Sequence, residues 1–130
     1  MSLKRHNPKS IALAGRYSLG VEIPPQARLL FVSGQVGVDS KGNTLAGIDK
    51  QCDQAWKNIG AVLRSAGMGY GDLVKVNAYL TDPRYVAAYR SARDRYIKAG
   101  DPVPASTLLI VTGLFMPEMM VEIEAVAAKS

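Results

Sequence analysis

The chain has very little cysteine and histidine: Cys52 and His6 are each the single residue of their type in 130 residues. One cysteine excludes an intrachain disulfide and any metal site built from several cysteines. One histidine, close to the start of the chain, argues against a Ser–His–Asp nucleophile and against the His/His or His/Glu pairs that cleave RNA. Any chemistry must therefore come from other polar side chains.

Long apolar segments are also missing. No apolar run approaches the roughly 18 residues that a membrane span requires, and the first residues, Met1-Ser2-Leu3-Lys4-Arg5-His6, lack the apolar stretch of a signal peptide. We therefore expect a cytoplasmic protein with no membrane partner. Residues 1–9 are expected to be a flexible or tag-bearing N-terminus.

What is present is typical of one folded domain. Hydrophobic residues make up 48% of the chain and charged residues 21%, as in an ordinary globular protein, and the length predicts a single domain over residues 1–130. The net charge is +5, but the basic residues are scattered, so nucleic acid is not expected to be a partner.

The hydrophobic pattern alternates between strand and helix periods. Strands are predicted at 10–13, 17–23, 29–33, 72–80, 107–112 and 121–127, and helices at 49–66 and from Pro83 to about Ala99. Both helices need an apolar surface, and about six strands are available. This predicts an α/β domain with a mixed sheet of about six strands and two helices packed on one face. A symmetric oligomer would cover the other face.

Six segments, taken in order, resemble one known family. They are Gly15-Arg16-Tyr17-Ser18, Phe31-Val32-Ser33-Gly34-Gln35 with Val38-Asp39, the helix from Asn58 to Gly67, Leu73-Val74-Lys75-Val76 with Tyr79-Leu80-Thr81-Asp82, Pro104-Ala105, and Val121 to Ala127. Together they resemble the Rid/YjgF family, also called enamine/imine deaminases or L-PSP endoribonucleases.

The resemblance implies a chorismate-mutase-like fold assembled as a homotrimer, with a small-molecule cleft at each subunit interface. It implies no metal and no organic cofactor. In the deaminating branch, an arginine after Pro-Ala binds the substrate carboxylate through two parallel hydrogen bonds, a geometry that guanidinium provides. A glutamate on the last strand positions the water that attacks the imine carbon.

The chain departs from this pattern at the arginine. Ser106 follows Pro104-Ala105, and Tyr89 stands where the deaminating branch usually has asparagine. Serine does not replace two charge-assisted hydrogen bonds, each worth about 1.5–3 kcal/mol. The resemblance therefore predicts a retained cleft with an altered ligand.

The candidate site follows from these matches. Glu124 is the predicted catalytic carboxylate, and the predicted ligand contacts are Tyr17, Ser33, Gly34, Tyr89, Ser106 and Thr107. Each also has a structural interpretation: Glu124 as a solvated residue, Tyr89 as core, and Ser106 as a strand-end hydroxyl. Glu122 is interpreted as solvated and Cys52 as a small core residue. Arg16, beside Tyr17, is a candidate replacement for the missing guanidinium.

The leading hypothesis is a cofactor-independent hydrolase acting on a reactive imine, enamine or related metabolite at trimer interfaces. Ser106 argues against classical 2-imino acid deamination. The alternatives are a non-catalytic, metabolite-binding or regulatory trimer and an endoribonuclease of the L-PSP type.

Overall fold

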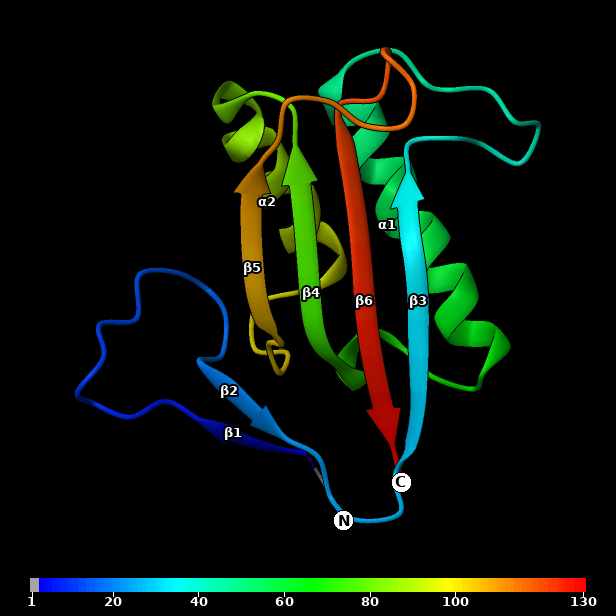
Figure 1. The fold of residues 1–130 in the computed structure, drawn as a ribbon. Helices are drawn as coiled ribbons and strands as arrows, with labels where there is room; N and C mark the ends of the chain where they lie inside the picture. The colour runs from blue at the N-terminus through cyan, green and yellow to red at the C-terminus, as the bar shows by residue number, and fades with distance from the viewer. Residues whose placement is uncertain (1–2) are drawn as a thin grey trace.

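The computed structural model describes residues 3–130, which form a four-stranded mixed sheet with two helices on one face (Figure 1). The helices are α1 (Ile48–Ser65) and α2 (Val86–Tyr96). The strands are β1 (Lys4–His6), β2 (Gly20–Glu22), β3 (Arg28–Val36), β4 (Leu73–Leu80), β5 (Ala105–Ile110) and β6 (Val121–Lys129). Short 3₁₀ turns at Tyr70–Asp72 and Pro83–Tyr85 precede β4 and α2 respectively. The fold class predicted from the sequence is confirmed. No helix within residues 3–130 is long and apolar enough to cross a membrane.

The sheet has the strand order β3-β6-β4-β5. β6 runs antiparallel to both β3 and β4, whereas β4 and β5 are parallel. The parallel pair is joined through α2, as a parallel connection requires a crossover. β3 and β5 are therefore the two opposite edges of the sheet. The predicted site residues are divided between these two strands.

The N-terminal third of the chain differs from the prediction. Six strands are present within residues 3–130, but β1 and β2 form a separate two-stranded ribbon instead of extending the sheet. Residues 10–13 form no strand. The chain on either side is held by a hydrogen bond from Leu19 N to Asn7 Oδ1 and by a bridge between Ser18 and Ala105. Within the expected flexible region 1–9, Lys4–His6 pair with β2, while residues 1–2 lie outside the described residues.

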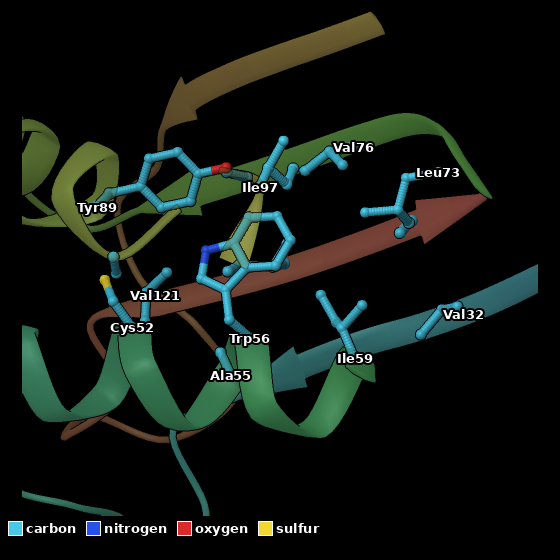
Figure 2. Packing of buried hydrophobic residues seen from close by; sticks show 14 of the residues in the cluster. Val32, Cys52, Ala55, Trp56, Ile59, Leu73, Val76, Tyr89, Ile97 and Val121 are labelled. Atoms are coloured by element: carbon cyan, nitrogen blue, oxygen red, sulfur yellow. The ribbon is translucent and has the colours of Figure 1, made fainter. Parts of the chain in front are cut away.

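The core lies between the helices and the sheet and is built around Trp56 of α1. Its ring lies 6.3 Å from that of Tyr89 and 6.4 Å from that of Tyr96, centroid to centroid, so the two helices meet through aromatic side chains. Figure 2 shows Trp56 between α1 and the sheet, with Ile59 and Val76 nearby. Removing an aromatic side chain of this size from a core costs about 3–5 kcal/mol.

The opposite face of the sheet carries the polar residues of the alternating strands. On β4 and β6 these are Lys75, Asn77, Tyr79, Glu122 and Glu124, whose neighbours in sequence point into the core. Both helices lie behind the sheet in Figure 1, and within residues 3–130 no helix covers this front face. We call it the open face.

The open face also exposes large apolar side chains. Phe31 of β3 is 72% exposed and Leu109 of β5 is 50% exposed. The two side chains lie at opposite edges of the sheet, on either side of the polar residues of β6 and β4.

Candidate functional site

A pocket of about 230 Å³ opens on this face where β3, β6 and β4 lie side by side. Its lining combines polar groups with apolar ones. The residues are Phe31, Val32, Ser33, Lys75, Asn77, Glu124, Ala125 and Val126. Two of the predicted site residues, Glu124 and Ser33, are thus brought together here.

Glu124 is held by donors from β4. The Tyr79 hydroxyl donates a hydrogen bond to Glu124 Oε1, and Asn77 Nδ2 donates to the same oxygen at 3.4 Å. The hydrogen bond to the carboxylate, followed by desolvation, raises the pKa of the Tyr79 phenol. Tyr79 therefore stays protonated as a donor, and the orientation of Glu124 is fixed.

Lys75 is the only cationic side chain in the lining of this pocket. Its Nζ donates to Thr107 Oγ1 at 2.8 Å, which joins β4 to the predicted ligand residue on β5. Within residues 3–130, Lys75 forms no ion pair. The pocket thus holds a cation and an anion that are each anchored by neutral groups.

Glu122 is the residue that sequence reasoning missed. Its carboxylate lies against the backbone of Gly34, so closely that a Cβ built on Gly34 would be 2.8 Å from Glu122 Cδ. The register between β3 and β6 shifts between Val32 and Gln35, which marks a bulge at Ser33 and Gly34. Within the described residues the Glu122 carboxylate has no hydrogen-bond or ion-pair partner. The signal was present in the sequence, since Glu122 and Glu124 share one strand face.

A second hollow, of about 450 Å³, lies on the outer side of the bulge and includes Gly34. It is bounded by α1 through Asn58, whose Nδ2 donates to Val36 O at 3.3 Å and Val38 O at 3.0 Å. Gln54 Nε2 donates to Asn58 Oδ1 at 2.8 Å. These bonds fix the chain that follows β3, so the Gly34 backbone has a defined position.

Ser106 and Tyr17 lie at the opposite edge of the sheet. Ser18, next to Tyr17, donates through its backbone N to Pro104 O at 2.9 Å and bridges to Ala105 at the start of β5. Ser106 pairs with Val76 and alternates with Thr107, so its side chain is on the helix side of β5, away from the open face. Within one chain, Ser106 and Tyr17 are therefore not part of the Glu124 pocket.

Tyr89 is a core residue, which corrects its placement among the ligand contacts. It is 1% exposed and packs against Trp56 on the helix side of the sheet (Figure 2). Burial raises the pKa of its phenol. The tyrosine at position 89 thus fills the core between α1 and α2 in this chain.

Arg16 is engaged within the chain. Its Nη1 donates to Asp94 Oδ1 at 2.8 Å, and its Nη2 donates to Lys98 O. Both ends of the guanidinium are therefore committed to α2 and the residues after it, and the structure gives no support to Arg16 as a free carboxylate-binding fork.

Cys52 and His6 do not take part in either hollow. Burial, with a further effect of Asp49, raises the pKa of the Cys52 thiol to about 12, so it remains a protonated core side chain. His6 Nε2 lies 2.8 Å from Glu22 Oε1 on the exposed β1–β2 ribbon. Within residues 3–130 there is no cluster of three or more His, Cys, Asp or Glu residues that could hold a metal ion.

Comparison with known proteins places this geometry in a family. The family model described as endoribonuclease L-PSP matches residues 7–129. The chain belongs to the Rid/YjgF family.

Among its relatives, a RutC family protein of Aquifex aeolicus is 34% identical over 123 residues, which cover 94% of this chain and 95% of the relative. The 2-iminobutanoate/2-iminopropanoate deaminase of Mus musculus is 30% identical over 124 residues, covering 93% of this chain and 87% of that protein. Among solved structures, YyfB of Yersinia pestis, a Rid family protein of unknown function, superposes with a TM-score of 0.85 at 29% identity, covering 98% of both chains.

This Rid/YjgF chain therefore retains the family fold, and Ser106 is the residue that follows Pro104-Ala105. The polar open face therefore carries two carboxylates that differ in their hydrogen bonding. Glu124 is held by Tyr79 and Asn77, whereas Glu122 is free beside Gly34.

Proposed function

We propose that the protein is a cyclic homotrimer that hydrolyses a small, reactive imine or enamine in clefts between neighbouring copies. The observation that carries this proposal is the division of the predicted site between the two edges of the sheet. Ser33 and Gly34 are on β3, whereas Ser106 and Thr107 are on β5.

A head-to-tail ring of copies would reunite the two halves. In such a ring the same two different surfaces meet at every interface, and closure after three copies leaves none unpaired. The β5 edge of one copy, with Tyr17 and Ser106, would then face the β3 edge of the next, with Gly34 and Glu122. The exposed Phe31 would be covered in the same assembly.

Glu122 is the carboxylate best suited to take a proton from the attacking water. It has no partner within the described residues, and it lies in close contact with the Gly34 backbone on the bulge of β3. Glu124, the carboxylate predicted from the motif, already accepts from Tyr79 and Asn77. In this proposal Glu124 organises the pocket floor while Glu122 acts as general base.

The reaction needs no cofactor. Water adds to the C=N carbon as its proton moves to the carboxylate, and the resulting tetrahedral carbinolamine collapses to a carbonyl compound and ammonia as the nitrogen takes up protons. The relatedness to a 2-iminobutanoate/2-iminopropanoate deaminase of Mus musculus supports this reaction class. The serine at position 106 supports a substrate that is held differently from a classical 2-imino acid.

The test measures ammonia release from freshly generated imines, including 2-iminopropanoate and neutral analogues, with wild-type protein, E122Q and E124Q. We expect E122Q to lose turnover by about 10²-fold or more, the range of a missing general base. E124Q should lose less, because glutamine still accepts from Tyr79. Binding of substrate analogues without turnover by the wild type would contradict the hydrolase and favour the non-catalytic, metabolite-binding alternative.

Mixing two inactive variants tests the shared cleft. E122Q alters only the β3 side, and a bulky S106W substitution alters only the β5 side, so each homotrimer has three defective clefts. Random mixed trimers would restore about one quarter of the clefts, each formed from two unaltered halves. Activity of the co-expressed mixture that stays at the level of the single variants would contradict a cleft built from two copies.

A further inference from the structure

The open-face pocket contains a charged group that the proposed reaction does not use, Lys75. Lys75 shares the lining of this pocket with Phe31, Val126 and Asn77, and Val126 is its partner across β4 and β6. We infer that Lys75 is the anion-binding group of this pocket and that the ligand is a small carboxylate. This inference rests on the proposed function and specifies the substrate class of the same site.

The position of Lys75 is set by its neighbours. Lys75 pairs in register with Val126 on β6 and Ala105 on β5, in the middle of the sheet. Its ammonium donates to Thr107 Oγ1 at 2.8 Å. An ammonium has three N–H donors, so two remain for a ligand after Thr107 is satisfied.

The charge of Lys75 is not neutralised within the described residues. Six ion pairs are found in residues 3–130, and Lys75 takes part in none. Glu124 lines the same pocket but accepts from Tyr79 and Asn77 rather than from Lys75. The two opposite charges are therefore held apart by neutral anchors.

Such an arrangement fits a dipolar ligand. An anionic group would bind Lys75, a polar nitrogen or hydroxyl would face Glu124 and Ser33, and a short apolar chain would pack against Val126. A lysine provides a point charge rather than a bidentate fork. This cation reaches the open face from β4, whereas the arginine position of the motif, now Ser106, is on the other side of β5.

The experiment compares two probes of the same shape, pyruvate and pyruvamide, which differ in the negative charge. Their affinities are measured by calorimetric or ligand-observed NMR titration of wild-type protein, K75M, K75R and T107V. We expect K75M to weaken pyruvate binding by about tenfold or more, as for a lost charged hydrogen bond. K75R should bind within about threefold of wild type, because charge is kept.

The controls distinguish the effect of the Lys75 charge from the effect of the protein's net charge and from a loss of folding. K50M removes the same charge from the exposed side of α1 and should leave pyruvate affinity unchanged. T107V removes only the anchor and should weaken pyruvate binding by a smaller factor than K75M does. Because T107V keeps the lysine, it tests the site even if K75M fails to fold, which circular dichroism would reveal.

The outcomes distinguish this inference from the proposed function. Lys75-dependent pyruvate binding in a protein that releases no ammonia from imines supports the anion site and contradicts the hydrolase. Imine turnover with unchanged KM in K75M, or equal affinity of wild type and K75M for pyruvate, overturns the anion site and leaves the hydrolase standing. Absence of pyruvate binding to wild type also overturns it.

Discussion

The carboxylate of Glu122 lies against the backbone of Gly34, and no other residue type fits at position 34 without displacing it. This relationship connects a bulged edge strand to a free carboxylate on the next strand. The glycine at position 34 is required by its neighbour across the sheet, since its own φ is not in the left-handed region.

Replacing Gly34 by alanine should therefore affect function more than stability. The added methyl group overlaps the end of a flexible side chain. Glu122 can move aside, so the cost in the free energy of unfolding should be about 1 kcal/mol, the low end for an added methyl group. Moving a reacting group by about an ångström lowers turnover by tenfold or more. Steady-state kinetics and urea unfolding of G34A check both effects.

Gly113 gives a matched control, because a Cβ there meets nothing within 4 Å. G113A should keep both activity and stability. In an E122Q background the G34A substitution should have no further effect, because the two changes act through one group. Independent, multiplicative losses in the double variant would show that Gly34 acts by another route.

Replacing Tyr89 by phenylalanine should leave ligand binding unchanged and preserve or slightly raise stability. The Tyr89 hydroxyl is buried and, within the described residues, has no hydrogen-bond partner. An unsatisfied buried hydroxyl costs about 1–3 kcal/mol, so its removal offsets the small loss of packing. Urea midpoints and pyruvate titration of Y89F measure the two effects. Weaker pyruvate binding by Y89F, with an unchanged urea midpoint, would show that Tyr89 contacts the ligand.

The lowered pKa of Asp53 predicts that the free energy of unfolding depends on pH. The Tyr96 hydroxyl donates to Asp53 Oδ1 at 2.6 Å, and this bond, with further effects of Lys57 and Arg95, lowers the pKa of the Asp53 carboxyl. A lowered pKa in the folded state stabilises the fold above the unfolded pKa of about 3.9, and that stability is lost as the pH falls through the folded value.

The variant D53N should accordingly be less stable than wild type by about 1 kcal/mol at pH 7, a value reduced for solvent exposure. The difference should shrink as the pH falls below the unfolded pKa of about 3.9 and then through the lower folded pKa of Asp53, where the wild-type carboxylate also becomes neutral. Urea unfolding across this pH range measures it, and Y96F should show the same trend because it removes the donor. If the free energies of unfolding of D53N and wild type changed in parallel with pH, the Asp53 carboxylate would not be the source of the pH dependence.

Most of the fold could be predicted because the local sequence patterns favour the same helices and strands that the packing of the core requires. The helix at 49–66 and the strand at 72–80 match α1 and β4 closely, since a continuous apolar stripe and a strict alternation each specify one structure. The β1–β2 ribbon was not predicted. Its strands have three residues each, and their pairing depends on a contact between segments on either side of a long loop.

The site was predicted in part for the same reason. Ser33 and Glu124 line the same pocket, and their roles as ligand contact and catalytic carboxylate stay predictions. The orientation of Ser106 depends on the register of β5 against β4, which no local pattern reveals. Tyr89 looked like a ligand contact because the motif places a polar residue there, but the apolar surroundings of Trp56 determine its burial.

The assembly is the central claim, since the two halves of the site meet only if copies pack edge to edge. Phe31, at the open face, provides the variant that should disrupt it, because an aspartate there places a charge in an apolar contact. A61D, on the exposed side of α1, is the control that adds the same charge away from the sheet.

Sedimentation equilibrium measures the mass of the assembly directly. The wild type and A61D should sediment at three times the chain mass of 14.0 kDa, and F31D should shift toward the mass of one chain while keeping its circular dichroism spectrum. A wild-type protein that sediments as a single chain at concentrations where it is fully folded would contradict the account.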